Sequence, residues 1–124
     1  MTIGWCFDNT YHKLSNIFRE DIKPIPVKKP ELVLLNKTLA ENLNLNFSNL
    51  DNQELSELFS GNSLPKGSNS IAQAYAGHQF GHFTMLGDGR AVLIGEHLSK
   101  DSKRYDIQFK GSGKTAFSRN GDGR

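Results

Sequence analysis

The clearest periodic pattern in this chain is an alternation of apolar and polar residues over positions 105–110. The odd-numbered positions are tyrosine, isoleucine and phenylalanine, and the even-numbered positions are Asp106, Gln108 and Lys110. Successive side chains of a β-strand point to opposite faces of the sheet. We therefore expect a strand at 105–110 that turns its odd positions toward a core and carries Lys110 on the opposite face.

Two further apolar runs, at residues 79–86 and 91–98, surround the sequence Gly87-Asp88-Gly89-Arg90. An Asp-Gly pair suits a tight two-residue turn, because both central positions need a positive φ that Asp tolerates and glycine adopts without steric cost. The pattern predicts a β-hairpin that turns at these residues. The charged segment 99–104 is then an exposed loop that leads into the strand at 105–110.

The first half of the chain begins with a proline-rich segment. Pro24, Pro26 and Pro30 predict extended backbone that leads into the apolar run 31–35, which has the length of a strand. We therefore expect a strand at 31–35.

Two short amphipathic helices are predicted between residues 36 and 61. Asn36 is a suitable N-cap for the first helix, Asp51 and Glu54 form a capping-box pattern for the second, and Gly61 is placed to end it. The apolar positions are Leu39, Leu43 and Leu45 in the first helix and Leu55, Leu58 and Phe59 in the second. Such helices usually cover one side of a sheet. The expected fold is therefore α+β, with an antiparallel sheet and two short N-terminal helices.

The composition changes near Ser70, from segments rich in Asn, Lys and Leu to glycine, aromatic and β-branched residues. We expect residues 1–69 to be an N-terminal extension with a strand and the two helices. Residues 70–124 are expected to hold the glycine-rich hairpin and the lysine strand.

The length and charge of the chain narrow the choice of function. Its 124 residues suit one small domain or part of one, and eight Phe, three Tyr and one Trp provide for a modest core. With 15 Lys and Arg against 13 Asp and Glu, the net charge is only +2, and the basic residues are spread along the chain. Nucleic acid is therefore not an expected partner.

Cys6 is the only cysteine, which excludes an intrachain disulfide and a cysteine-based zinc cage. A reducing compartment fits this composition, and we expect no disulfide-linked partner. The N-terminus has no basic region followed by a long apolar run, and no stretch approaches the roughly 20 apolar residues that cross a bilayer. We therefore expect a soluble, cytoplasmic protein without a membrane partner.

Glycine pairs recur in the second half, at 87/89, 111/113 and 121/123, and each has a cationic residue near it, namely Arg90, Lys110 or Arg119. Any one pair alone is most simply an ordinary turn. Together with the cations, however, they favour a phosphate site, because glycine lets an anion approach the backbone N–H groups. A glycine turn followed by a strand lysine is how kinase-like N-lobes hold nucleotide phosphates, although Val92 stands where a third glycine is expected.

The sequence gives weaker support to three other kinds of site: a P-loop, a metal site and an acid–base pair. The sequence Gly113-Lys114-Thr115 suggests a P-loop, but Gln108 replaces its first glycine and Gly121 follows too soon for the long helix that such a loop needs. His78 and His82 share a strand face without an evident third metal ligand. Asp88 and Asp122 each precede a glycine, where Asp usually serves the backbone geometry rather than acid–base chemistry.

Several long motifs of this sequence closely resemble the selenoprotein O family. They are the runs 74–81, 86–91, 93–96, 108–113 and 117–124, together with Phe7-Asp8-Asn9 and the stretch 30–36. The motifs occur in the family's order and spacing, and the similarity extends over nearly the whole chain.

The resemblance implies a protein-kinase-like fold whose members bind ATP in an inverted orientation and transfer AMP to hydroxyl side chains of proteins. Carried over position by position, it implies an ATP site at Gly87, Gly89, Arg90, Lys110, Asp122 and Gly123. Ala116 departs from the family's usual Pro.

Family members are several times longer than this chain. The resemblance therefore implies that the chain is the N-terminal part of an incomplete kinase-like N-lobe. The glutamate that pairs with the lysine, the catalytic aspartate, the Mg²⁺ or Mn²⁺ ligands and a redox-active cysteine or selenocysteine would lie beyond Arg124. No catalytic or metal-binding residue is then expected within the 124 residues, and the chain alone should be inactive.

The function implied is the ATP-binding part of a protein adenylyltransferase that acts on Ser, Thr or Tyr hydroxyls. The alternative from another class is a noncatalytic nucleotide-binding or interaction module. A P-loop phosphohydrolase is the weakest of the three.

Overall fold

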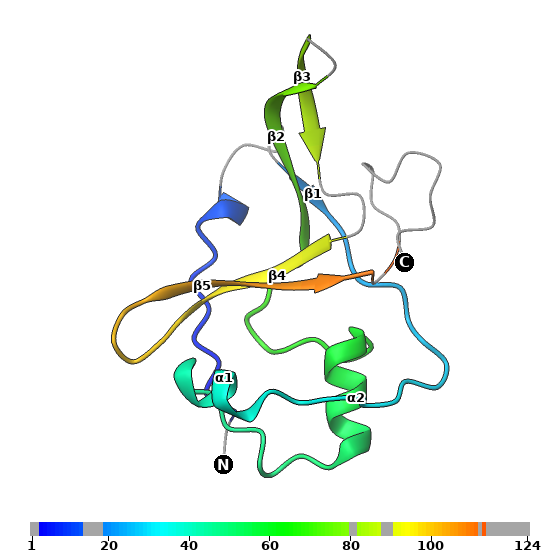
Figure 1. Cartoon of the computed structure of the whole chain (residues 1–124), viewed down its shortest axis with the longest axis vertical. Coiled ribbons are helices and arrows are strands. Elements are labelled where there is room, and N and C mark those ends of the chain that lie inside the picture. Colours follow the sequence, from blue (N-terminus) through cyan, green and yellow to red (C-terminus); the bar gives the residue numbers. More distant parts are fainter. Residues whose placement is uncertain (1–2, 14–18, 80–81, 88–90, 112, 114–124) are drawn as a thin grey trace.

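The protein is an α+β fold in which an antiparallel sheet carries two short helices on one face, as the sequence predicts (Figure 1). The computed structural model describes residues 3–13, 19–79, 82–87, 91–111 and 113. The elements are η1 (Tyr11–Lys13), β1 (Arg19–Asp21), α1 (Lys37–Asn42), α2 (Asn52–Ser60), β2 (Ile71–Gln79), β3 (His82–Gly87), β4 (Ala91–Leu98) and β5 (Arg104–Lys110).

The sheet has the strand order β1-β2-β4-β5, and β3 pairs with β2 outside this path. β2 serves two parts of the sheet. Its first residues pair with β1 and, through Ile71 and Leu93, with β4, whereas residues 74–79 pair with β3. The paired strands β2 and β3 therefore rise as an arm on the side of β4 and β5 opposite the helices (Figure 1).

The predicted hairpin between residues 79–86 and 91–98 is wrong, because β3 pairs with β2 and β4 pairs with β5. Gln79 lies opposite His82, so only Phe80 and Gly81 separate the strands. A two-residue connection with glycine second is a favoured hairpin loop, and it is shorter than the connection to β4. The same pairing puts His78 and His82 on neighbouring strands rather than on one face of a single strand.

β4 is the central strand, and its residues 92–97 are buried on both faces. A bulge between Leu93 and Gly95 shifts its register against β5. β5 alternates between half-buried and exposed residues along its whole length, which confirms the strand predicted at 105–110.

Both helices form where their caps predict. The side chain of Asn36 accepts a hydrogen bond from the Leu39 N–H at 3.0 Å, Asp51 and Glu54 form the capping box, and Gly61 ends α2 with φ +87°. The helices and the turn between them build an apolar cluster of Ala40, Leu43, Leu45, Phe47, Leu55 and Leu58. Tyr105 and Ile107 of β5 pack against it, so the helices cover one face of the sheet as expected.

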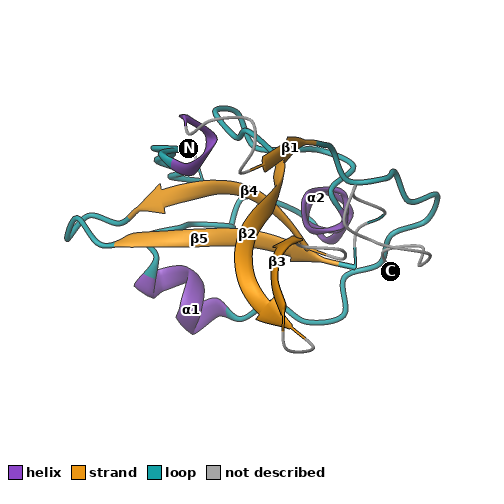
Figure 2. Ribbon diagram, turned by 90° about the horizontal axis from the view of Figure 1, so that it is seen from above, coloured by secondary structure: helices purple, strands orange, loops and turns teal. Residues whose placement is uncertain are grey.

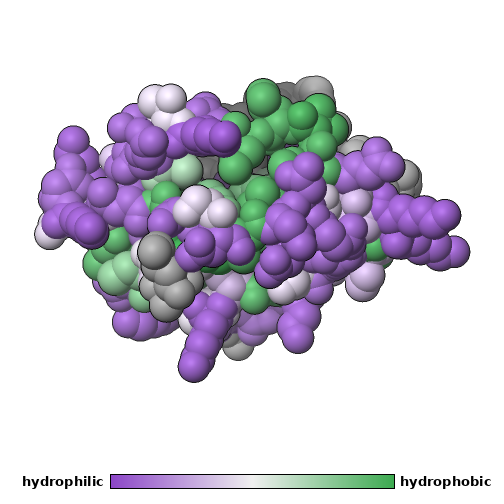
Figure 3. Space-filling model, turned by 90° about the horizontal axis from the view of Figure 1, so that it is seen from below, coloured by the Kyte–Doolittle hydropathy of each residue, from purple (hydrophilic) through white to green (hydrophobic). Residues whose placement is uncertain are grey.

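The run 31–35 is not a strand. Leu32 and Leu35 pack against the helical cluster, whereas Val33 and Leu34 are 96% and 84% exposed. The partly buried positions are thus three residues apart rather than alternating, and no described strand pairs with this segment. Apolar side chains consequently gather at the surface on the helical side of the molecule (Figure 3).

Replacing Asp51 by Ala should lower the free energy of unfolding by about 1 kcal/mol, because the cap of α2 loses its acceptor for the Glu54 N–H. Urea unfolding followed by circular dichroism measures this loss. Asp51→Asn keeps a side-chain acceptor and is expected to stay close to the wild type. Equal stability of the Ala and Asn variants would contradict the role of the cap.

Candidate functional site

Lys110 is the last residue of β5 and is exposed, whereas Phe109 before it is half-buried. This confirms the prediction that Lys110 lies on the face opposite the core residues of the strand. Its ammonium group makes no ion pair with any residue in the described ranges. A cation at the end of a strand is therefore available for an anionic ligand.

The strand register places Lys110 opposite the first residue of β4. Ala91, the first residue of β4, lies directly opposite Lys110, and Gly87 ends β3 four positions earlier in the sequence. Gly89 and Arg90 fall between these strands, outside the described residues. Ala91 and Lys110 therefore lie at the same end of the β4–β5 pair, and the direction of Lys110 relative to residues 88–90 stays a prediction.

The chain turns sharply directly after Lys110. Gly111 and Gly113 have φ values of +77° and +133°, which glycine alone adopts readily. A Cβ on Gly113 would lie 2.6 Å from Cγ1 of Ile25. The pair thus has a structural role in the backbone, and Asp122, Gly123 and Arg119 lie outside the described residues.

A hollow of about 330 Å³ opens beside Lys110. Its lining includes Val27, Phe59, Gln108 and Gly111. Gln108 lies inside β5, so the position that a P-loop needs for its first glycine is part of a strand here. Lys114 and Thr115 are outside the described residues.

The described residues around Lys110 offer a positive charge beside a glycine turn. An exposed ammonium group on a paired strand, next to a backbone turn of glycines, can hold an anion by charge and by N–H donation. Within the described ranges, no group of three or more His, Cys, Asp or Glu residues could hold a metal ion.

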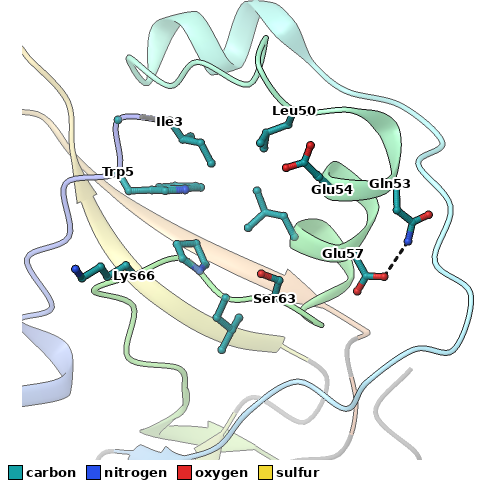
Figure 4. A pocket seen from close by; sticks show the side chains of 12 residues that line it. Ile3, Trp5, Leu50, Gln53, Glu54, Glu57, Ser63 and Lys66 are labelled. Carbon is teal, nitrogen blue, oxygen red and sulfur yellow. Dashed lines mark hydrogen bonds between the residues drawn. The ribbon is translucent and has the colours of Figure 1, made fainter. Parts of the chain in front are cut away.

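A much larger hollow, of about 750 Å³, lies on the helical side between the N-terminal residues, α2 and the segment 63–66 (Figure 4). Ile3 and Trp5 form one wall, and Glu54 and Glu57 of α2 form the other. None of its lining residues belongs to β3, β4 or β5, so it is separate from the lysine site.

Sequence reasoning missed the polar cluster that fixes the N-terminal segment to β4. The Asp8 N–H donates to the Glu96 carbonyl at 2.8 Å, and the Leu98 N–H donates to the Cys6 carbonyl at 2.8 Å. Phe7 forms an isolated bridge with His97. Residues 6–8 therefore run beside the central strand as an extra strand-like strap.

The buried side chain of Glu96 is the centre of this strap. Its carboxylate accepts hydrogen bonds from the Thr10 hydroxyl at 2.6 Å and from the Tyr11 N–H at 2.7 Å. Nη1 of Arg104 lies 3.4 Å from the same carboxylate, and Nη2 lies 2.8 Å from the Asp8 carboxylate. One arginine on β5 thus joins a buried carboxylate of β4 to a carboxylate of the strap.

His97 and Asn9 complete these contacts. Nδ1 of His97 accepts from the Cys6 N–H at 3.1 Å, which leaves Nε2 to donate to the Leu43 carbonyl at 2.6 Å. The Asn9 amide donates to the Gly67 carbonyl and accepts from the Glu96 N–H. In the sequence, only the Phe7-Asp8-Asn9 motif pointed to this region. In the structure these three residues contact β4 and β5 and hold the strap in place.

The hydrogen bond with Arg104 is the main reason why the pKa of Asp8 is lowered from its usual value, and the charges of Arg104 and Lys13 add to it. Asp8 also raises the pKa of Arg104. A carboxylate whose pKa is lower in the folded state contributes stability above its unfolded pKa of about 3.9 and loses it as the pH falls through the folded value.

We therefore expect the free energy of unfolding to fall as the pH drops below about 4, and Asp8→Asn to weaken this dependence. Urea unfolding at a series of pH values between neutral and strongly acidic measures it for both proteins. Parallel pH profiles would show that the Asp8–Arg104 contact does not contribute.

The sequence of this chain is similar to known proteins over its whole length. The family model described as Protein adenylyltransferase SelO matches residues 2–124. The protein nucleotidyltransferase YdiU of Pelagibacter ubique is 68% identical over 124 residues, which is all of this chain and 26% of that protein. The protein of the same name from Nitrosococcus oceani is 62% identical over 98% of this chain and 25% of its own length.

A further YdiU protein, from Brevibacillus brevis, is 53% identical over 98% of this chain and 25% of its own length. The chain thus spans about a quarter of the length of the curated relatives that it matches.

In the described part of the chain, no helix is long and apolar enough to cross a membrane.

Proposed function

Because this chain belongs to the SelO family of protein adenylyltransferases, we propose that it forms the ATP-binding part of an enzyme that transfers AMP to protein hydroxyl groups. In this reaction the oxygen of a Ser, Thr or Tyr side chain forms a bond with the α-phosphorus of ATP. The bond between the α-phosphorus and the bridging oxygen breaks, pyrophosphate leaves, and the hydroxyl proton passes to a base.

The single observation that supports a phosphate role in this chain is the position of Lys110. It is exposed at the end of β5, opposite the first residue of β4, and it has no ion-pair partner among the described residues. We propose that its ammonium group binds ATP phosphate. Gly87, Gly89 and Arg90 are proposed to contact the same phosphates, and Asp122 and Gly123 to complete the ATP site.

Mg²⁺ or Mn²⁺ is proposed as the metal partner of ATP, where it would neutralise phosphate charge. The chain's own contribution is to orient the phosphates through Lys110 and the glycine backbone.

The single cysteine, Cys6, is free, which supports a reducing, cytoplasmic location.

The alternative is a noncatalytic module that binds a nucleotide or a protein without transferring AMP. The share of each relative that the chain covers favours this alternative for the 124 residues by themselves. Calorimetric titration of the chain with Mg-ATP is expected to show at most weak binding. Its contacts would be made in water, where a close charge pair contributes about 1 kcal/mol.

A chimeric enzyme tests the proposal directly. The matching quarter of the Pelagibacter ubique relative is replaced by this chain, and purified protein is incubated with ATP labelled at the α- or the γ-phosphate. We expect protein labelling from α-labelled ATP and none from γ-labelled ATP. Labelling from γ-labelled ATP would indicate kinase activity, and no labelling by a chimera that binds ATP would favour the noncatalytic module.

A further inference from the structure

The extended segment 24–27, which follows β1, is fixed by one side chain that binds its backbone twice. Oδ1 of Asn62 accepts a hydrogen bond from the Val27 N–H at 2.7 Å, and Nδ2 of Asn62 donates to the Val27 carbonyl at 2.7 Å. One amide thereby satisfies both backbone groups of one residue, as a neighbouring antiparallel strand would. Asn62 directly follows Gly61, so the segment is tied to the end of α2.

The same segment also packs against the end of α2. Pro24 is buried, and a Cβ on Gly61 would lie 2.5 Å from Cβ of Pro24 and 3.4 Å from Cδ2 of Phe109. The glycine therefore lets both the segment and β5 approach the helix end closely. In two perpendicular views α2 lies beside the end of β5 (Figure 1 and Figure 2).

Ile25 lies between Pro24 and Val27 and contacts the turn that follows Lys110. A Cβ on Gly113 would lie 2.6 Å from Cγ1 and 2.7 Å from Cδ1 of Ile25, so the isoleucine side chain packs directly on the backbone of this turn. Lys110 thus lies between two supported residues, Phe109 before it and Gly113 after it.

We propose that Asn62 is a positioning residue for the ATP site, which acts on Lys110 through Ile25 and the glycine turn. This inference rests on the proposed function, in which Lys110 binds ATP phosphate. β4 holds Lys110 from one side through Ala91, and the segment 24–27 holds the backbone that follows. Such support matters because a misplacement of about 1 Å by a remote substitution can cost a hundredfold in rate.

In the chimera, Asn62→Ala should raise the KM for ATP about tenfold and leave kcat within about twofold. The amide contacts no phosphate itself, so its loss weakens the lysine contact equally in the ground state and in the transition state, and such a loss appears in KM. Ile25→Ala should act in the same direction. Because both side chains act through one turn, the double variant should match the more severe single variant rather than multiply the two effects.

Asn36→Ala is the matched control. It also removes an asparagine side chain that accepts a backbone hydrogen bond, from the Leu39 N–H at 3.0 Å, but this bond caps α1. We expect it to lower the urea midpoint of the chimera, as Asn62→Ala does, and to leave the KM for ATP unchanged. An equal rise in KM in both variants would mean that stability alone is responsible and would overturn the proposal.

Limited trypsin digestion of the chimera without nucleotide measures the turn itself. Trypsin cleaves after Lys and Arg, and cleavage between Lys110 and Gly111 requires local opening at the end of β5. Asn62→Ala should accelerate this cleavage about tenfold and leave cleavage after Lys103, in the loop before β5, unchanged.

Unchanged cleavage at Lys110, an unchanged KM for ATP, or multiplied effects in the double variant would overturn the positioning role. A wild-type chimera that fails to bind ATP would instead refute the proposed function. The cleavage rates would then still decide whether Asn62 supports the turn, because they are measured without nucleotide.

Discussion

Replacing Lys110 by Ala in the chimera should lower AMP transfer to protein between about tenfold and a hundredfold. A charge-assisted contact with phosphate contributes about 1.5 to 3 kcal/mol, and each 1.4 kcal/mol corresponds to a factor of ten. Lys110 is exposed at the end of a paired strand, so its removal leaves the core cluster intact. Incorporation of label from α-labelled ATP measures the loss.

Two matched lysine variants keep this prediction specific. Lys103→Ala removes another exposed cation, from the loop before β5, and should leave transfer unchanged. Lys114→Ala should also have little effect, whereas a P-loop would depend on Lys114 rather than Lys110. Wild-type labelling by the Lys110→Ala protein would refute the proposed phosphate contact.

Gly95→Ala should destabilise the fold by about 1 to 3 kcal/mol, the usual cost of adding an atom to a filled core. The Cβ would lie 2.3 Å from a ring carbon of Phe7 and 2.9 Å from the Asn9 side-chain oxygen. Movement of the Phe7 ring away from this Cβ would disturb its stacking on Trp5, where the ring centroids are 5.2 Å apart. Urea unfolding measures the loss.

The combination of Gly95→Ala with Phe7→Ala separates this clash from a general effect of the substitution. Phe7→Ala alone removes the stacking with Trp5 and costs stability of its own. If the clash is the cause, the double variant loses less stability than the two single variants together. If the losses of unfolding free energy are additive, the clash with Phe7 is not the reason why position 95 requires glycine.

The local signals of this sequence predicted local structure well. The caps at Asn36, Asp51 and Gly61 fix the helix ends through contacts within a few residues, and the alternation along β5 shows which side chains face the core. Each of these features depends on neighbours in the sequence, so a single sequence contains the information.

Pairing between strands was harder to predict. The glycine pair near residues 87–90 suggested a hairpin, yet β3 pairs with β2 and β4 pairs with β5. The run 31–35 has apolar residues but no described strand beside it. Which strands meet is decided by tertiary packing, which apolar composition alone does not reveal.

The candidate site was predicted in part. The sequence identified Lys110 and its face, and the structure adds that Ala91 lies across from it. The strap was not predicted, because Asp8 and Glu96 are ordinary charged residues in the sequence. Their roles follow from their contacts with Arg104, between positions as many as 96 residues apart.

The strap also constrains the order in which the protein can fold during its synthesis. The Cys6 N–H and its acceptor His97 are 91 residues apart. At about 5 to 20 residues per second, a ribosome takes roughly 5 to 18 s to cover that distance. Trp5 and Phe7 are synthesised before β4 but gain their places only after it has been made, so this early segment must wait for a later one before it becomes native.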